Sequence, residues 1–239
     1  MSTNHIAASA PSVAPDANAI TAAPVPVEDI APSWKLLATL GIAGAVSGLL
    51  IAALYTALLP MIERYKSNEL HSAINEVLET PARSDTLYLQ NGALTATRPS
   101  GDEAKTAQRI YHGFDREGKS VGYAIEAIGP GFSENIRLLV GYDAARHELL
   151  AMKILESKET PGIADGVLKP EFSRQFQRAT VPVVGVKASP KTPDKGTVVM
   201  ITGATISSRA IIRAINNTLA RWEPLITKFE TAAPTSSTL

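Results

Sequence analysis

The segment Thr202–Ser208, with the sequence TGATISS, carries residues that could bind an anionic group. Gly203 and Ala204 are small enough to let a ligand approach the backbone closely. One of the two serines could cap a helix that begins there, and the unpaired amides and positive end of such a helix favour a phosphate. Thr205 would then hold its hydroxyl at an anion site. The same spacing also fits an ordinary capped helix that binds nothing.

A second polar segment, Glu156–Gly162 with the sequence ESKETPG, directly follows a predicted strand. Its Pro-Gly pair predicts a turn, and the residue before a proline is pushed into an extended conformation, so Thr160 can present its hydroxyl and carbonyl outward. Glu156 and Glu159 could form an acid–base pair, but the sequence supplies no nucleophile or third partner. We therefore expect no catalytic residues here, and a simple polar turn remains the alternative.

A third segment, Gly129–Phe132 with the sequence GPGF, also follows a predicted strand. A glycine-rich turn with an aromatic residue suits packing against a flat ligand ring. It suits the corner of a β-hairpin equally well.

The overall composition excludes several classes of function. The 239 residues include 23 Lys and Arg and 23 Asp and Glu, so the formal charge is zero, whereas nucleic-acid-binding proteins normally have a basic excess. We expect no nucleic-acid partner. Cysteine is absent, which excludes zinc ribbons, iron–sulfur ligation, disulfides and thiol nucleophiles. The four histidines are far apart in the sequence, so no metal site is predicted.

The N-terminal part of the chain predicts a disordered tail and a membrane anchor. Residues 1–33 contain nine Ala and five Pro and no Lys or Arg. They offer too little apolar surface to offset the entropy of ordering, and they lack the early basic residues of a targeting peptide. The 24 residues Leu36–Leu59 carry no charge, which predicts a transmembrane helix at 34–62. Lys35 precedes this span and two basic residues follow it, so the positive-inside rule favours a cytoplasmic C-terminus by one charge.

Residues 66–230 predict one domain of the α+β class with a mainly antiparallel sheet, and residues 231–239 predict a flexible tail. Apolar residues at helical spacing over 70–78 predict an amphipathic helix after the membrane span. The last helix is predicted to begin near Ser207 and to end at Pro224, because proline interrupts helical hydrogen bonding. Strands are predicted at 109–114, 120–128, 136–142, 148–155, 180–186 and 197–201, with a helix at 170–178.

The order of these features resembles a known family. An N-terminal span, a glycine-aromatic turn, an ETPG loop and a TGAT segment that opens the last helix follow one another. In this the chain resembles the G subunit of Rnf-type ion-translocating electron transport complexes. It is more distantly similar to the C subunit of the sodium-pumping NADH:quinone reductase and to other FMN-binding domains of that kind. The resemblance covers residues 36–222.

The resemblance implies a cofactor and its site. In that family FMN is joined through its phosphate to a threonine by a phosphodiester bond, and a separate flavin transferase installs it from FAD. Thr205 matches that threonine, and the ETPG loop matches the segment that lies against the isoalloxazine ring. The FMN-binding residues implied in this way are Thr202, Gly203, Ala204, Thr205, Ile206, Ser207, Glu159, Thr160, Pro161 and Gly162.

One position departs from the family pattern. The attachment motif usually has an aspartate six residues before the acceptor threonine, and this chain has Val199 there. If the transferase needs that carboxylate, attachment would be inefficient or absent. If Val199 merely continues the preceding strand, recognition tolerates the change. We expect attachment.

The resemblance further implies a role and a location. The chain would relay electrons within a complex that couples ferredoxin and NAD redox chemistry to ion transport, together with other membrane subunits. It would be a single-pass protein of the bacterial inner membrane with its domain in the periplasm, against the one-charge bias noted above. A non-flavinylated structural or assembly subunit and an independent membrane flavin domain are the alternatives.

Overall fold

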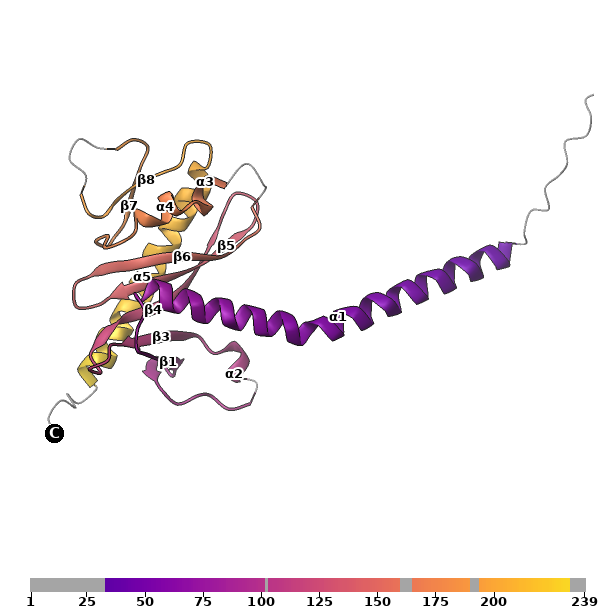
Figure 1. The fold of residues 1–239 in the computed structure, drawn as a ribbon, viewed down its shortest axis with the longest axis horizontal. Coiled ribbons are helices and arrows are strands. Elements are labelled where there is room, and N and C mark those ends of the chain that lie inside the picture. The colour runs from indigo at the N-terminus through magenta and orange to yellow at the C-terminus, as the bar shows by residue number, and fades with distance from the viewer. Residues whose placement is uncertain (1–32, 102, 160–164, 190–193, 233–239) are drawn as a thin grey trace, which may run out of the picture. The chain divides into compact units, whose positions relative to one another are not determined.

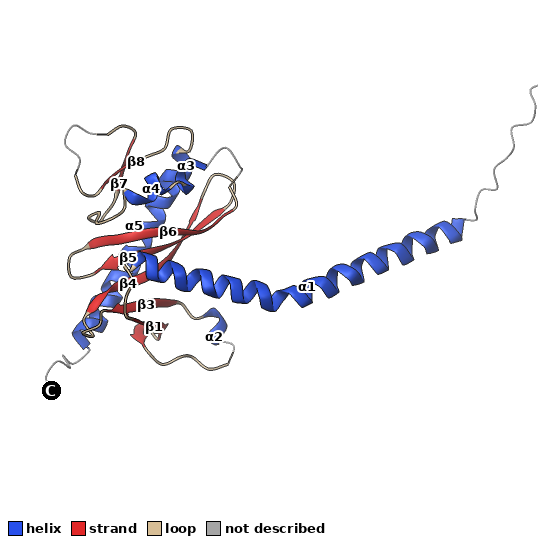
Figure 2. Cartoon of the chain, viewed as in Figure 1, coloured by secondary structure: helices blue, strands red, loops and turns tan. Residues whose placement is uncertain are grey.

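The structure is a computed structural model that describes residues 33–101, 103–159, 165–189 and 194–232, without the side chains of 104 and 105. The chain divides into two units, Met1–Leu58 and Leu59–Leu239. Helix α1 (Ser33–Val77) provides the described part of the first unit and continues into the second (Figure 1). All other elements belong to the second unit (Figure 2).

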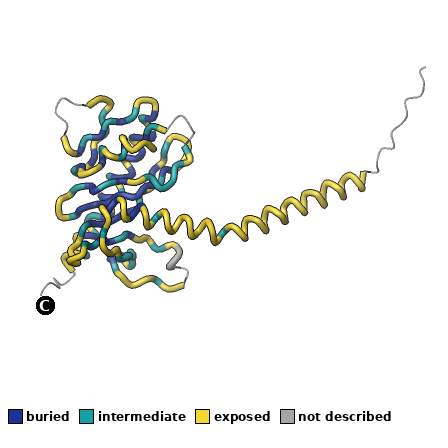
Figure 3. The backbone as a smooth tube through the Cα atoms, viewed as in Figure 1, coloured by how far each residue is buried: buried dark blue, intermediate teal, exposed yellow. Residues whose placement is uncertain are grey.

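Helix α1 contains the predicted membrane span. Among the described residues it is the one helix that is long and apolar enough to cross a membrane, and the most apolar part of it is fully exposed (Figure 3). Leu40 and Leu49, for example, are 73% and 74% exposed. A helix that is apolar all round suits a lipid environment rather than water. The helix predicted at 70–78 is not separate, because α1 runs through Pro60 to Val77.

The domain is built on a six-stranded antiparallel sheet with the strand order β2-β1-β3-β4-β5-β6. The α+β class with a mainly antiparallel sheet is thereby confirmed. Four strands match their predicted ranges to within two residues, whereas β1 and β2 were not predicted, because β1 begins with polar residues and lacks a clear alternation. The strands are β1 (Arg83–Gln90), β2 (Ala93–Thr95), β3 (Arg109–Phe114), β4 (Ser120–Pro130), β5 (Asn135–Asp143) and β6 (Glu148–Ser157).

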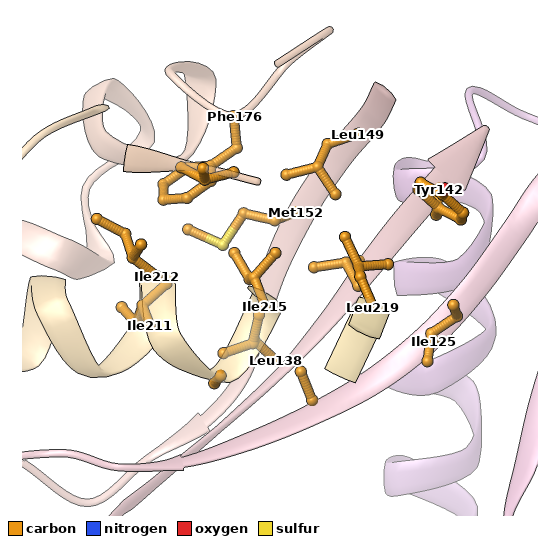
Figure 4. Close-up of a cluster of buried hydrophobic side chains, with 14 of the residues drawn as sticks. Ile125, Leu138, Tyr142, Leu149, Met152, Phe176, Ile211, Ile212, Ile215 and Leu219 are labelled. Atoms are coloured by element: carbon orange, nitrogen blue, oxygen red, sulfur yellow. The ribbon is translucent and has the colours of Figure 1, made fainter. Parts of the chain in front are cut away.

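Each face of this sheet has its own hydrophobic cluster. Successive side chains of a strand point to opposite faces, and here Ile125 belongs to the larger cluster while Ala124 belongs to the smaller one. The larger cluster is covered by helix α5 (Thr205–Ala232), and Figure 4 shows side chains of α5 meeting those of the strands. The smaller cluster is covered by the end of α1, with the buried residues Ala73, Ile74 and Val77, and by Leu78, which directly follows the helix.

The remaining elements are short. Helix α2 (Glu103–Thr106) precedes β3, and α3 (Asp165–Leu168) and α4 (Pro170–Arg174) follow β6. Strands β7 (Val184–Val186) and β8 (Thr197–Val199) form a separate two-stranded parallel sheet. The predicted helix at 170–178 and the predicted strand at 180–186 are therefore both shorter than expected.

Helix α5 differs from its prediction at both ends. It begins at Thr205, two residues earlier than expected, and it continues through Pro224 to Ala232. A proline inside a helix costs about 3 kcal/mol, but tertiary contacts hold the segment beyond it. Ile226 is fully buried, and Glu230 accepts a 2.9 Å hydrogen bond from the Tyr123 hydroxyl. Burial and this carboxylate raise the pKa of Tyr123, so its phenol remains a donor.

The buried His112 makes the stability of the domain depend on pH. Its ring stacks on Tyr123 at 4.3 Å, its Nε2 lies 2.8 Å from the Ser120 hydroxyl, and burial lowers its pKa from 6.5 to about 4. Between these two pH values the unfolded chain binds a proton that the folded chain does not. We expect the free energy of unfolding to fall by about 3 kcal/mol from pH 6.5 to pH 4, at about 1.4 kcal/mol for each pH unit.

Urea unfolding of the full-length protein in detergent at several pH values would measure this effect. His112→Gln cannot titrate, so this part of the pH dependence should be missing from it. Equal slopes for the two proteins between pH 6.5 and pH 4 would contradict the assignment to His112.

Candidate functional site

The TGAT segment forms the tight connection from β8 to α5. Thr205 is the first residue of α5, is half-buried, and donates a hydrogen bond from Oγ1 to the Ile201 carbonyl at 3.3 Å. Gly203 has a φ of +87°, a conformation that favours glycine, and a Cβ built there would meet nothing within 4 Å. The Thr205 hydroxyl therefore lies beside a turn whose glycine faces open space.

The two serines that follow do not act as the predicted caps. Ser208 is fully buried; its Oγ accepts a hydrogen bond from the Ile201 amide at 3.1 Å and donates one to the Ala204 carbonyl at 2.9 Å. These two hydrogen bonds stabilise the turn from its buried side. Ser207 is 1% exposed, and its hydroxyl has no hydrogen-bond partner among the described residues. Because α5 starts at Thr205, both serines lie inside its first turn rather than before it.

The start of α5 has the chemistry of a phosphate site. Ser208 is the first residue of α5 whose amide bonds to a carbonyl four residues earlier, that of Ala204 just before the helix. The amides of Thr205, Ile206 and Ser207 therefore have no carbonyl partner within the helix. These amides and the helix dipole favour an anion. A buried hydroxyl without a partner, as in Ser207, is uncommon in proteins. The residues present therefore fit a phosphate ester on the Thr205 oxygen.

The loop after β6 joins the glycine-aromatic turn through Glu159. The Glu159 Oε1 accepts a hydrogen bond from the Phe132 amide at 2.7 Å, and both carboxylate oxygens lie 3.4 Å from the Ser133 amide. A Cβ at Gly131 would overlap this carboxylate and would lie 2.7 Å from the Glu134 carbonyl oxygen, so a larger residue there would displace the Glu159 contact. The structure thus brings the GPGF segment and the first part of the ETPG loop into contact, although they lie apart in the sequence. Thr160, Pro161 and Gly162 lie outside the described residues.

The two carboxylates of this loop bind different partners. Glu156 accepts a 3.0 Å hydrogen bond from Arg137, which lowers the pKa of Glu156, whereas Glu159 binds backbone amides. Arg137 also contacts Glu126 at 2.7 Å. Glu156 and Glu159 are therefore both engaged in structural contacts rather than paired as an acid and a base.

The C-terminal end of β4 contacts both α5 and the loop that contains Glu159. Gly129 of β4 packs against α5, where a Cβ would lie 2.8 Å from the Ala214 Cβ and 3.0 Å from the Ala210 carbonyl oxygen. Two residues further on, Gly131 adjoins Glu159. The end of β4 therefore lies between the α5 segment that follows Thr205 and the loop that contains Glu159.

Val199, the position that departs from the family pattern, is the last residue of β8. Its amide donates to the Gln175 Oε1 at 2.7 Å, and its carbonyl accepts from the Gln175 Nε2 at 3.2 Å. The side chain is half-buried. Sequence reasoning did not select Gln175 or the buried Ser208 hydroxyl bonds, because their partners are backbone groups and leave no sequence motif.

Comparison with known proteins shows what this domain is similar to. Residues 131–220 match the FMN-binding domain family. The G subunit of the ion-translocating oxidoreductase complex of Methanosarcina acetivorans is 27% identical over 183 residues, which cover 77% of this chain and 90% of the relative. The corresponding G subunit of Shewanella baltica is 29% identical over 171 residues, which cover 70% and 79%.

The fold also has a solved counterpart. The crystal structure of NqrC from Shewanella oneidensis matches with a TM-score of 0.60 and covers 71% of this chain and 100% of that one. At 17% identity this likeness concerns the fold alone. The range that matches the FMN-binding domain family includes both Thr205 and Glu159.

Proposed function

We propose that this chain, whose resemblance to the G subunit of ion-translocating oxidoreductase complexes is confirmed, is a membrane-anchored electron carrier with FMN bound covalently to Thr205. The observation that supports this most is the position of the Thr205 hydroxyl at the start of α5, beside amides without a helix partner and inside the FMN-binding domain. The matching domain family and the relatives support FMN and an electron-carrier role, and the phosphodiester bond is our proposal.

Attachment is a phosphoryl transfer from FAD by a flavin transferase. The Thr205 Oγ1 forms a bond to the flavin-side phosphorus of FAD, the bond from that phosphorus to the bridging pyrophosphate oxygen breaks, and AMP leaves. The hydroxyl proton, which Thr205 otherwise directs at the Ile201 carbonyl, is lost in the same step. The phosphodiester keeps one negative charge, which the amides of Thr205–Ser207 can bind. Thr202, Gly203 and Ala204 form the turn around it.

The ETPG loop has the second role in the proposed site. FMN, when bound, supplies the ability to accept and pass on electrons, and the protein orients it and excludes side reactions. We propose that Glu159, Thr160, Pro161 and Gly162 border the flavin ring. Glu159 acts by holding the Gly131–Ser133 turn through its hydrogen bonds to backbone amides.

The location and partners follow the same family. We propose a single-pass protein of the bacterial inner membrane, with a transmembrane helix at 34–62, an FMN-binding domain at 66–230 in the periplasm, and terminal tails at 1–33 and 231–239. Its partners are other membrane subunits of an Rnf-type complex and, during maturation, a flavin transferase. The candidate span in α1 and the names of the relatives support this arrangement.

The intact mass of the chain purified from its native host tests the proposal. We expect the mass to exceed that of the polypeptide by one FMN less one water, and the band on a denaturing gel to fluoresce under ultraviolet light. A chain of bare polypeptide mass from cells with an active transferase would instead indicate a structural or assembly subunit, the alternative that Val199 suggests. Isolation in mild detergent without multi-span partners would favour an independent membrane flavin domain.

A further inference from the structure

The small parallel sheet of β7 and β8 leads directly into the Thr205 turn. The two strands pair over three residues each, and the Met200 amide extends the pairing with a 2.8 Å bond to the Val186 carbonyl. A two-stranded sheet of this length has two outer edges and little stability of its own. Contacts on these edges can therefore add to the stability of β8, the strand that leads into the turn.

Strand geometry identifies the backbone groups on the outer edges. The amide and carbonyl of successive strand residues point alternately to the two sides. The Val184 amide bonds to the Gly196 carbonyl at 2.8 Å, so Val184 faces β8 and Val183 faces away from it. In the same way Met200 faces β7, so Val199 faces away.

On each outer edge, one outward-facing residue is bound by the carboxamide of a side chain. The Asn216 Oδ1 accepts from the Val183 amide at 2.9 Å, and its Nδ2 donates to the Val183 carbonyl at 2.8 Å. Gln175 makes the corresponding pair of bonds with Val199, at 2.7 and 3.2 Å. A carboxamide thus replaces a neighbouring strand on each edge.

The two side chains come from well-anchored positions. Gln175 is the residue that directly follows α4, and it lies in the sequence between Phe172 and Phe176, which are both fully buried with rings 5.3 Å apart. Asn216 belongs to α5, the helix that Thr205 begins, and its neighbour Ile215 is fully buried. The Gln175 carboxamide therefore holds β8, the strand that leads into the turn before Thr205. The Asn216 carboxamide holds the β7 edge against α5, the helix that follows this turn.

We propose that Gln175 and Asn216 are positioning residues for the Thr205 acceptor turn. The Gln175 carboxamide holds β8 in place, and the Asn216 carboxamide holds α5 against the β7 edge. The turn between β8 and α5 is thereby fixed, so the Thr205 hydroxyl is already in the conformation in which the flavin transferase binds it. This inference rests on the proposed function, since it concerns the same turn. It assigns to two side chains outside the TGAT segment a role in its modification.

Flavinylation of the full-length chain in detergent tests the inference. Protein made without the transferase is incubated with purified flavin transferase and FAD, and the initial rate is read from gel fluorescence. We expect Gln175→Ala and Asn216→Ala each to lower the rate about tenfold, as expected when hydrogen bonds worth about 1.4 kcal/mol are lost. The exposed neighbours provide matched controls, and Gln177→Ala and Asn217→Ala should react at the rate of the unmodified sequence.

Hydrogen exchange separates positioning from a general loss of stability. Gln175→Ala should accelerate exchange of the Val199 amide and leave that of Val183 slow, and Asn216→Ala should do the reverse, whereas global destabilisation would accelerate both. Should an alanine variant fail to fold, Gln175→Glu serves in its place, because it still accepts from the Val199 amide but no longer donates to the carbonyl. Its rate should be intermediate.

The outcomes distinguish this inference from the proposed function. If the unmodified sequence is never labelled at Thr205, the proposed function fails and this inference fails with it. If that sequence is labelled, and the Gln175 and Asn216 variants are labelled equally fast, this inference alone is overturned.

Discussion

Thr205→Ala should abolish covalent FMN while leaving the fold nearly intact. The replaced hydroxyl is half-buried and makes one long hydrogen bond, 3.3 Å to the Ile201 carbonyl, so its loss should cost about 1 kcal/mol or less. The hydroxyls of Ser207 and Ser208 cannot substitute easily, because both are buried and Ser208 already makes two hydrogen bonds. The expected result is therefore a folded protein without flavin.

Intact mass and gel fluorescence measure this outcome directly. Thr205→Ser keeps a hydroxyl at the same position and should retain some label. Thr227→Ala removes a hydroxyl from the far half of the same helix, where it bonds only to the Glu223 carbonyl among the described residues, and should be labelled normally. Full labelling of Thr205→Ala would show that another residue is the acceptor.

Gly129→Val should destabilise the domain by about 3 kcal/mol or more. Gly129 is a point at which β4 approaches α5 closely, because a Cβ at this position would lie within 3.0 Å of the Ala214 Cβ and the Ala210 carbonyl oxygen. A valine there must push the helix away from the sheet, and overpacking of a dense core typically costs about 1–3 kcal/mol before any larger shift of the backbone. The start of α5 would move with it, so flavinylation should fall as well.

Urea unfolding of the full-length protein measures the loss in free energy of unfolding, and the double variant Gly129→Val with Ala214→Gly tests its cause. Gly129→Ala alone should be destabilised less than Gly129→Val. Adding Ala214→Gly removes the methyl group that the new Cβ meets, so the double variant should be more stable than the sum of the two single changes predicts. Strict additivity would mean that contact with Ala214 is not the source of the loss.

Much of this protein could be predicted from local sequence alone. The charge-free stretch Leu36–Leu59 defines a helix that suits a membrane whatever follows it, because hydropathy and length are properties of the segment itself. Short runs of apolar, strand-forming residues bounded by turns located β3–β6, because such runs are a property of the segment itself. The TGAT and ETPG segments indicate the FMN-binding family without any knowledge of the contacts around them.

The end of α5 shows where local rules were insufficient. Proline at position 224 predicts a helix end, yet the helix continues because Glu223 and Glu230 accept hydrogen bonds from Tyr142 and Tyr123 and because Ile226 is buried. The partners lie on β4 and β5, about 80 residues or more earlier in the chain. A preference of about 3 kcal/mol is outweighed by contacts that the sequence of the helix does not contain.

In the candidate site, too, some features follow from the local sequence and others only from tertiary contacts. Residue type and spacing alone placed Thr205 in a small-residue turn that leads into the last helix, because such a turn and the amides after it are local features. The resemblance of the TGAT and ETPG segments to a known family added the expectation of FMN. Only the tertiary structure decided that Glu159 binds the Phe132 amide, and that Gln175 and Asn216 bind the outer edges of β8 and β7. A side chain that bonds to a distant backbone group needs no particular partner residue, so such a contact exists only once the chain has folded.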